Sequence, residues 1–176
     1  MNPTLQSKLD QLEHETKVLF NRIDQLSEEQ LQDPSYGWSI IQVLAHLNQS
    51  ETGTIIYMTK KMQAGDKMPA YSTGGKLRMT LTKMLLRSPL RWKAPKPVAH
   101  PDADHSLEEM KDLWKTSREK TRSFVKDFPE KYLNKAVFKH PMAGRIDLAG
   151  ALDSMTYHQR HHLHQIKRIK QAIGGK

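Results

Sequence analysis

Cysteine is absent from this 176-residue chain. Its absence excludes disulfide bonds, thiolate metal ligands and iron–sulfur clusters. It also agrees with a reducing compartment, where disulfides rarely persist. Any metal binding through thiolate sulfur is thereby excluded.

Long apolar runs are missing as well. No segment approaches the roughly 20 consecutive apolar residues that a transmembrane helix requires. The first residues, MNPTLQSKLDQLEHE, are polar and contain no apolar core of a signal peptide. We therefore expect a cytoplasmic protein without a membrane span, and its length favours a single domain over residues 1–176.

Acidic residues are absent from one long segment, between Lys67 and Pro101. The formal net charge of the chain is +9, and much of this excess belongs to that segment. Its basic residues are Lys67, Lys76, Arg78, Lys83, Arg87, Arg91, Lys93 and Lys96. The excess positive charge is therefore concentrated in this segment and is not spread over the whole surface.

This basic segment has four interpretations. It is a lid that carries Trp92 and cations toward an acidic thiol or carboxylate substrate, a surface helix that contacts anionic lipid, a nucleic-acid-binding element, or a solvated crossover. No RNA- or DNA-reading motif occurs in the chain, so nucleic acid is the least favoured partner.

Apolar residues recur at three- and four-residue spacing in four long stretches, which is typical of amphipathic helices. The spacing predicts helices over residues 4–26, about 40–64, 107–128 and 148–173. In the third of these, Leu107, Met110, Leu113, Ser117, Thr121, Phe124 and Phe128 share one face. The segment of about 65–104 is rich in proline and glycine, and we expect in it one short amphipathic helix followed by an extended arm.

Capping residues mark where these helices begin. Ser27, Ser39 and Ser106 are each followed three residues later by Gln or Glu, which is the spacing of a capping box. Asp147 is a suitable N-cap for the last helix. No convincing strand is visible, so the sequence predicts an all-α four-helix bundle with a long crossover between the second and third long helices.

Three histidines lie on the apolar faces of two of these helices. His158 and His162 are four residues apart on the buried stripe of the last helix, where aliphatic residues normally stand. His46 lies in the strongly apolar segment IIQVLAHL. A buried imidazole without a partner costs about 1–3 kcal/mol, so the three indicate either a metal site or a hydrogen-bonded core cluster. Gln159 follows His158, so the metalloprotease motif HExxH and its glutamate base are absent.

The sequence resembles the DinB-like superfamily of metal-binding four-helix bundles. The matching segments are GWSIIQVLAHL, HPMAGRIDLAGALDSM and HQRHHLHQI. Because the chain length and the order of the helices also fit, the resemblance covers nearly the whole chain. The resemblance implies that His46, His158 and His162 are the metal ligands. It also implies a bacterial, cytoplasmic protein that is commonly a homodimer.

Four further residues are candidates to support the ligands or the substrate. Gln165 continues the stripe one turn past His162, and His161 lies at its edge. Tyr57 is on the His46 side of its helix, and His140 precedes the last helix. Each also has a structural interpretation. Gln165 is then a buried amide, His161 a solvated ring, Tyr57 a residue of aromatic packing and His140 a turn residue. Arg145 and Arg160 are candidates for an anionic substrate group.

The resemblance leaves the reaction open. Members of the family resemble metal-dependent hydrolases or transferases of low-molecular-weight thiols such as bacillithiol or mycothiol. Zinc is the first expectation for the metal, and nickel, iron and manganese also suit imidazole. The substrate is then a small molecule, a thiol or an anionic compound. The alternative is a non-catalytic binding or stress-response module stabilised by the metal.

Overall fold

The computed structural model of the protein describes residues 2–88, 101–102 and 104–174. Most of the expected extended arm, including Trp92, lies outside these residues. Among the described residues the structure has six α-helices and one small two-stranded sheet. Their bounds are α1 Pro3–Asn21, α2 Glu28–Gln32, α3 Ile40–Met62, α4 Thr73–Arg87, α5 Leu107–Lys126, β1 Phe138–His140, β2 Gly144–Ile146 and α6 Leu148–Ile173.

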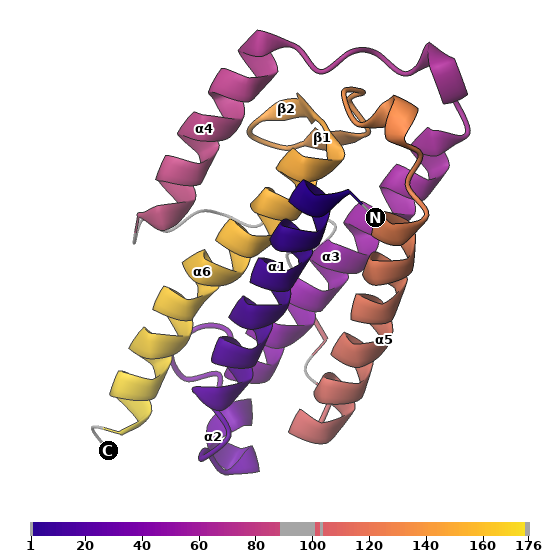
Figure 1. Ribbon diagram of the computed structural model, residues 1–176. Coiled ribbons are helices and arrows are strands. Elements are labelled where there is room, and N and C mark those ends of the chain that lie inside the picture. Colours follow the sequence, from indigo (N-terminus) through magenta and orange to yellow (C-terminus); the bar gives the residue numbers. More distant parts are fainter. Residues whose placement is uncertain (1, 89–100, 103, 175–176) are drawn as a thin grey trace.

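Four of these helices, α1, α3, α5 and α6, form the bundle (Figure 1). Helices α3 and α5 pack side by side and run in the same direction, and α1 and α6 form the second parallel pair. Two consecutive long helices can only be parallel if the chain returns toward the starting end between them, and α4 runs in this returning direction (Figure 1). The predicted four-helix bundle with a crossover is therefore confirmed.

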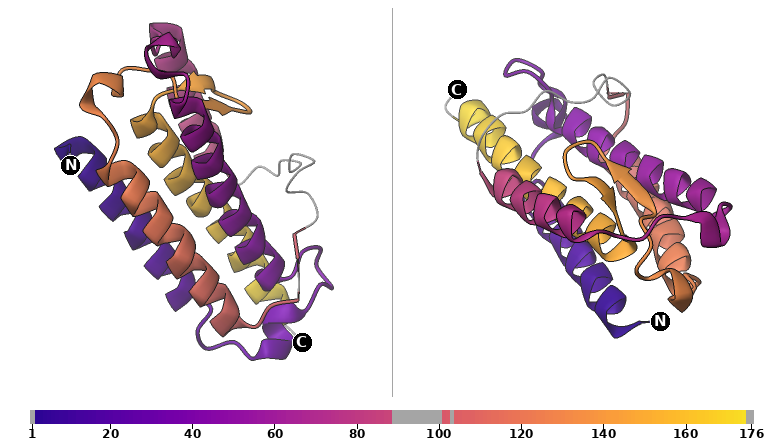
Figure 2. Two further views of the ribbon diagram at one scale, coloured as in Figure 1. Left: turned by 90° about the vertical axis from the view of Figure 1, so that its right-hand side faces the viewer. Right: turned by 90° about the horizontal axis from the view of Figure 1, so that it is seen from above.

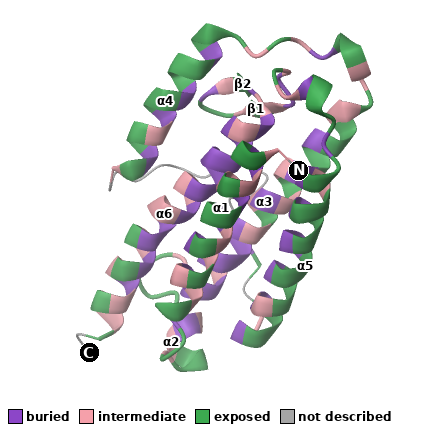
Figure 3. Cartoon of the chain, in the orientation of Figure 1, coloured by how far each residue is buried: buried purple, intermediate pink, exposed green. Residues whose placement is uncertain are grey.

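Helix α4 belongs to this crossover and lies outside the bundle. It packs against α6 and the small sheet, as the view from above shows in Figure 2. Exposed residues predominate along it (Figure 3). The predicted short amphipathic helix is thus present, and its position leaves one side open to solvent.

The predicted helix starts are confirmed by hydrogen bonds. Ser27, Ser39 and Ser106 each form a complete capping box. The Asp147 side chain accepts from the backbone N–H of Gly150 at 2.8 Å. Replacing such a cap by alanine typically costs about 1 kcal/mol, so these four residues fix both the position and the direction of entry of their helices.

Three expectations need correction. The first helix ends at Asn21, and residues 22–26 form turns. On α5 only one predicted position is wrong, because Leu107, Met110, Ser117, Thr121 and Phe128 are buried as expected. Leu113 is 42% exposed, whereas the neighbouring Trp114 is 2% exposed and packs edge-on against Phe20. Bulk explains this exchange, because burying the indole removes more apolar surface from water than burying leucine.

The third correction concerns strands, which were not expected. Strands β1 and β2 form an antiparallel hairpin just before α6. Lys139 pairs with Arg145 and His140 with Gly144. Gly144 has a φ of +71°, a conformation that glycine adopts without steric cost. The hairpin covers the end of the bundle from which α6 departs (Figure 1).

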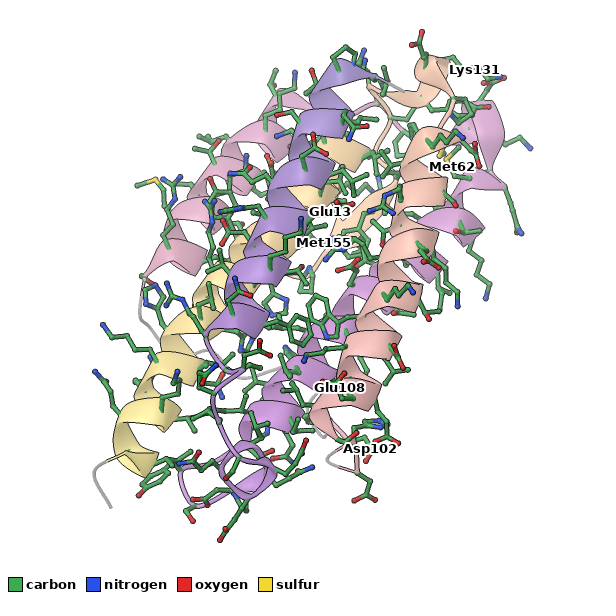
Figure 4. The ribbon with its side chains drawn as sticks, turned by 60° about the horizontal axis from the view of Figure 1, so that its bottom comes forward. Glu13, Met62, Asp102, Glu108, Lys131 and Met155 are labelled. Atoms are coloured by element: carbon green, nitrogen blue, oxygen red, sulfur yellow. The ribbon has the colours of Figure 1, made fainter. Side chains whose placement is uncertain are left out.

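Two apolar clusters fill the bundle. One contains Met58, Val125 and Leu148 and lies toward the hairpin, and the other contains Leu19, Leu44 and Ile166 and lies toward α2. Figure 4 labels Met155, which belongs to the first cluster and comes one turn before His158. Within the described residues, no helix combines the length and the hydropathy needed to cross a bilayer.

Candidate metal centre

The structure brings the three predicted histidines together. His46 comes from the second turn of α3, and His158 and His162 from adjacent turns of α6. The Nε2 atom of His158 lies 3.3 Å from Nε2 of His46 and 3.1 Å from Nε2 of His162. The ring centroids are 4.7–5.1 Å apart, and neighbouring rings are strongly tilted.

This geometry fits one metal ion. Two nitrogens bound to an ion at about 2.1 Å lie about 3.0–3.4 Å apart when the angle at the ion is roughly 90–110°. Both measured Nε2 separations, 3.1 and 3.3 Å, fall in this range. One ligand atom from each of the three residues lies within 4.8 Å of the other two, and no other group in the described part of the chain has such an arrangement.

Gln165 fixes the proton position on His162. Its Oε1 lies 2.8 Å from Nδ1 of His162. An amide oxygen only accepts, so Nδ1 carries the proton and Nε2 presents its lone pair to the other two imidazoles. This is the tautomer that binding through Nε2 requires.

Burial keeps the cluster neutral. His46 and His162 are 2% and 8% exposed, and His158 is half-buried. Burial, the charges of His162 and His46, and smaller effects of His161 and His140 lower the pKa of His158 well below its usual range. Burial and the nearby His46 lower the pKa of His162 to about 3, with the Gln165 hydrogen bond opposing the shift. Neutral imidazoles are the form that binds a metal.

Trp38 closes one side of His46. The centroid of its indole lies 5.0 Å from the centroid of the imidazole, with the planes at 49°. Trp38 precedes the capping residue Ser39, so the cap that starts α3 also places this ring beside the site. The apolar contact limits water around His46 and restricts the rotation of its ring.

Two of the other candidates lie near the ligands. His161 packs edge-on against His162 with ring centroids 5.5 Å apart, and burial lowers its pKa. His140, on β1, accepts from the N–H groups of Met142 and Ala143 at 3.1 Å through Nδ1. Burial lowers the pKa of His140 to about 4. His140 thus closes the hairpin turn, as its structural interpretation expects.

The remaining candidates are not brought to the cluster. Tyr57 is 41% exposed and stacks edge-on against Phe138. It follows His46 by eleven residues, about 16 Å along α3. Arg145 is exposed on the hairpin. Arg160 binds Glu15 through two hydrogen bonds of 2.9 and 2.6 Å, so its charge is already paired inside the protein.

A buried polar network lies next to the histidines, and the sequence analysis missed it. The Glu51 carboxylate is paired with the Arg118 guanidinium at 3.1 Å and accepts from the Thr121 hydroxyl at 2.8 Å. Arg118 also donates to Thr16, whose hydroxyl lies 3.2 Å from Oε1 of Gln159. The network therefore connects α3, α5, α1 and α6. The signal was present: Glu51 lies seven residues after Leu44 and seven before Met58, on an otherwise apolar stripe.

A further carboxylate ties α4 to the bundle. Asp153 of α6 is 8% exposed and accepts from Lys8 of α1 at 2.6 Å and from Lys83 of α4. Both lysines approach Asp153 from outside the core. The Lys83–Asp153 ion pair holds α4 against α6, on the part of α6 that precedes the histidine cluster. Between α1 and α5, Arg122 binds Glu13 at 2.5 Å in an exposed ion pair, and Figure 4 labels Glu13 on the side of α1 that faces α5.

The topology and the histidine cluster together define a class of protein: a four-helix bundle whose core histidines are arranged as metal ligands. A family model described as the DinB superfamily matches residues 11–166. The chain therefore belongs to the DinB superfamily, which confirms the family expected from the sequence motifs.

One solved structure shows the same fold. YfiT from Bacillus subtilis is described as a probable metal-dependent hydrolase with an unusual four-helix bundle topology. It superposes with a TM-score of 0.57 at 20% sequence identity, over 99% of this chain and 90% of YfiT. No protein among those with curated descriptions matches the sequence.

Proposed function

We propose that this protein is a metal-dependent hydrolase in which His46, His158 and His162 hold one divalent ion. The convergence of the three Nε2 atoms, at 3.1 and 3.3 Å from the central His158, carries the proposal. Three protein ligands are the number found in catalytic zinc sites, where further positions remain for water or substrate. The description of YfiT as a probable metal-dependent hydrolase supports the same assignment.

Zinc is the metal that the ligand set suits best. Three imidazoles without a thiolate or a carboxylate bind zinc well and also accept nickel, iron or manganese. A bound divalent ion would act as a Lewis acid that lowers the pKa of a coordinated water or thiol. The chain supplies the dry surroundings, because His46 and His162 are nearly inaccessible to solvent.

The other side chains position the ligands. Gln165 holds the His162 ring and its tautomer through the 2.8 Å contact. Trp38 packs against the His46 ring. His158 and His162 lie on one helix, α6, and the helix itself fixes the distance between them. The distance from these two to His46 depends on how α3 packs against α6.

The test combines metal analysis with activity. The purified protein should contain about one divalent transition-metal ion per chain, zinc being the first expectation, and it should hydrolyse members of an ester and amide panel. His158→Ala should remove both the metal and the activity while the helical signal remains. His164→Ala, an exposed histidine on the same helix, is the matched control and should retain both. A His158→Ala variant that retains the metal would refute the ligand assignment.

Thiol transfer is the second candidate function, and one observation favours it. Hydrolysis usually needs a base beside the metal, but the residue after His158 is Gln159, whose side chain contacts Thr16 of α1. A metal-bound thiolate is already a nucleophile and needs no such base. Activity that depends on an added low-molecular-weight thiol and an electrophile, and is absent with esters, would select this function.

A non-catalytic role makes a different prediction. If the metal only stabilises the bundle, its removal should lower the melting temperature strongly, and neither substrate panel should be turned over. A small change in melting temperature on chelation, together with loss of turnover, supports the enzyme.

A further inference from the structure

Helix α4 presents four large apolar side chains to solvent. Leu77, Leu81, Met84 and Leu85 are 64%, 51%, 62% and 38% exposed. At 100° per residue they fall within an arc of about 100°, so they form one continuous stripe along the helix. We call this stripe the outer face of α4. An apolar stripe of this kind on a surface helix marks a binding surface.

The outer face is a stable feature of the fold. The opposite side of α4 buries Met79, Thr82 and Leu86 against the rest of the protein. Lys83 bonds to Asp153 of α6, and Arg78 donates through Nε to the backbone carbonyl of Ala143. The helix is therefore held on its inner side, and its outer leucines cannot turn into the core without breaking these contacts.

Positive charge lines both edges of the outer face. By helical spacing Arg87 and Lys76 lie about 60° and 80° beyond Met84, and Arg78 lies about 20° beyond Leu85 on the other side. Arg87 also donates to the Tyr157 hydroxyl at 2.8 Å, and only Nε of Arg78 is bonded to Ala143. No acidic residue occurs between Lys67 and Pro101. An apolar stripe flanked on both sides by cations matches a bilayer surface in which acyl chains lie beneath anionic headgroups.

The positive edge continues onto α6. A pocket of about 330 Å³ next to the end of α4 is lined by Arg22, Arg87, Arg160, Leu163, His164 and Lys167. No carboxylate is among these lining residues, although Glu15 pairs with Arg160 from beneath. The pocket adds anion-binding capacity beside the outer face.

We propose that the outer face of α4 binds the surface of an anionic lipid bilayer. The apolar side chains enter the boundary between headgroups and acyl chains, and the flanking cations contact lipid phosphates. Charge complementarity favours lipid over a second copy of the chain, because two outer faces packed together would bring the cations of both copies close to one another.

The experiment measures binding of the full chain to vesicles by co-sedimentation. Vesicles contain phosphatidylcholine alone or with about one-third phosphatidylglycerol. We expect the protein to bind the anionic vesicles at least about tenfold more strongly, and the binding to weaken at high salt. Equal or absent binding to the two kinds of vesicle overturns the proposal.

The variant Leu81→Gln/Met84→Gln tests the apolar contribution. Both side chains are exposed, so the melting temperature should not change, while affinity for anionic vesicles should fall at least about tenfold. Leu113→Gln, an exposed leucine on α5, is the matched control and should bind as the wild type does. An unchanged affinity of the double variant, or an equal loss in the control, overturns the proposal.

Self-association is the competing outcome. Sedimentation velocity of the wild type and of Leu81→Gln/Met84→Gln distinguishes it. A wild-type dimer that the double substitution dissociates would make the outer face an interface between copies and would overturn the lipid assignment. The lipid assignment is supported if the double substitution leaves the oligomeric state unchanged and removes the binding to vesicles.

Discussion

His140 should make the stability of the protein fall as the solution becomes mildly acidic. Its Nδ1 accepts two backbone N–H groups of the hairpin, at 3.1 Å each, so protonation of this atom would break both hydrogen bonds. Burial lowers its pKa from 6.5 to about 4. The unfolded chain therefore binds a proton at this residue more readily than the folded chain does. Stability is complete above the unfolded pKa and is lost as the pH falls through 6.5 toward 4.

The size of the effect follows from these two pKa values. Between about pH 7 and pH 5 the unfolded imidazole becomes almost fully protonated, while the folded one remains almost fully neutral. The linkage relation then gives a loss of about 2 kcal/mol in the free energy of unfolding. The ligand histidines add their own losses, so the total fall in the wild type should be larger.

The variant His140→Asn isolates this contribution. An asparagine carbonyl can accept the same two N–H groups as an Asx turn, and it does not titrate. Urea denaturation of both proteins at the two pH values, with a chelator present to exclude metal, gives the four free energies needed. The variant should lose about 2 kcal/mol less than the wild type. Equal losses in the two proteins, within about 0.5 kcal/mol, would refute the reasoning.

Two further predictions concern the interior. Arg118→Met should lower the free energy of unfolding by about 3–5 kcal/mol, because it leaves the Glu51 carboxylate buried and unpaired. The double variant Glu51→Leu/Arg118→Met should recover most of that loss in urea denaturation, and purely additive losses would contradict the pairing. Gln165→Leu should weaken metal binding about 10- to 100-fold, because the His162 ring loses its partner. Competition with a chromophoric chelator measures this, and an unchanged affinity would rule out a role in binding.

The parts of the fold that the sequence predicted are those set by local interactions. Each capping box places its serine within three residues of the side chain that completes it, so the starts of α2, α3 and α5 are readable without tertiary information. The stripe containing His158 and His162 is also local, because one helix fixes the spacing of both rings. The proximity of His46 is not local. The apolar surroundings of the three histidines suggested it, and the family motifs then implied that His46 is a ligand.

The features that were missed are either too short to show a pattern or depend on tertiary contacts. The hairpin has strands of only three residues each, too short for an alternating pattern to be visible. The choice between Leu113 and Trp114 depends on the neighbouring Phe20 of α1. The pairing of Glu51 with Arg118 joins residues 67 positions apart, and no local signal links them.

The position of the buried polar groups argues that this level of the bundle is kept for function. The apolar clusters on either side stabilise the fold, whereas the histidines and the Glu51–Arg118 pair interrupt them at a cost in desolvation. Leucine at positions 46, 158 and 162 would fill the same space without that cost. Under the proposed function, the three histidines converging from two helices would instead gain favourable free energy when an ion binds, with Gln165 fixing the tautomer of His162.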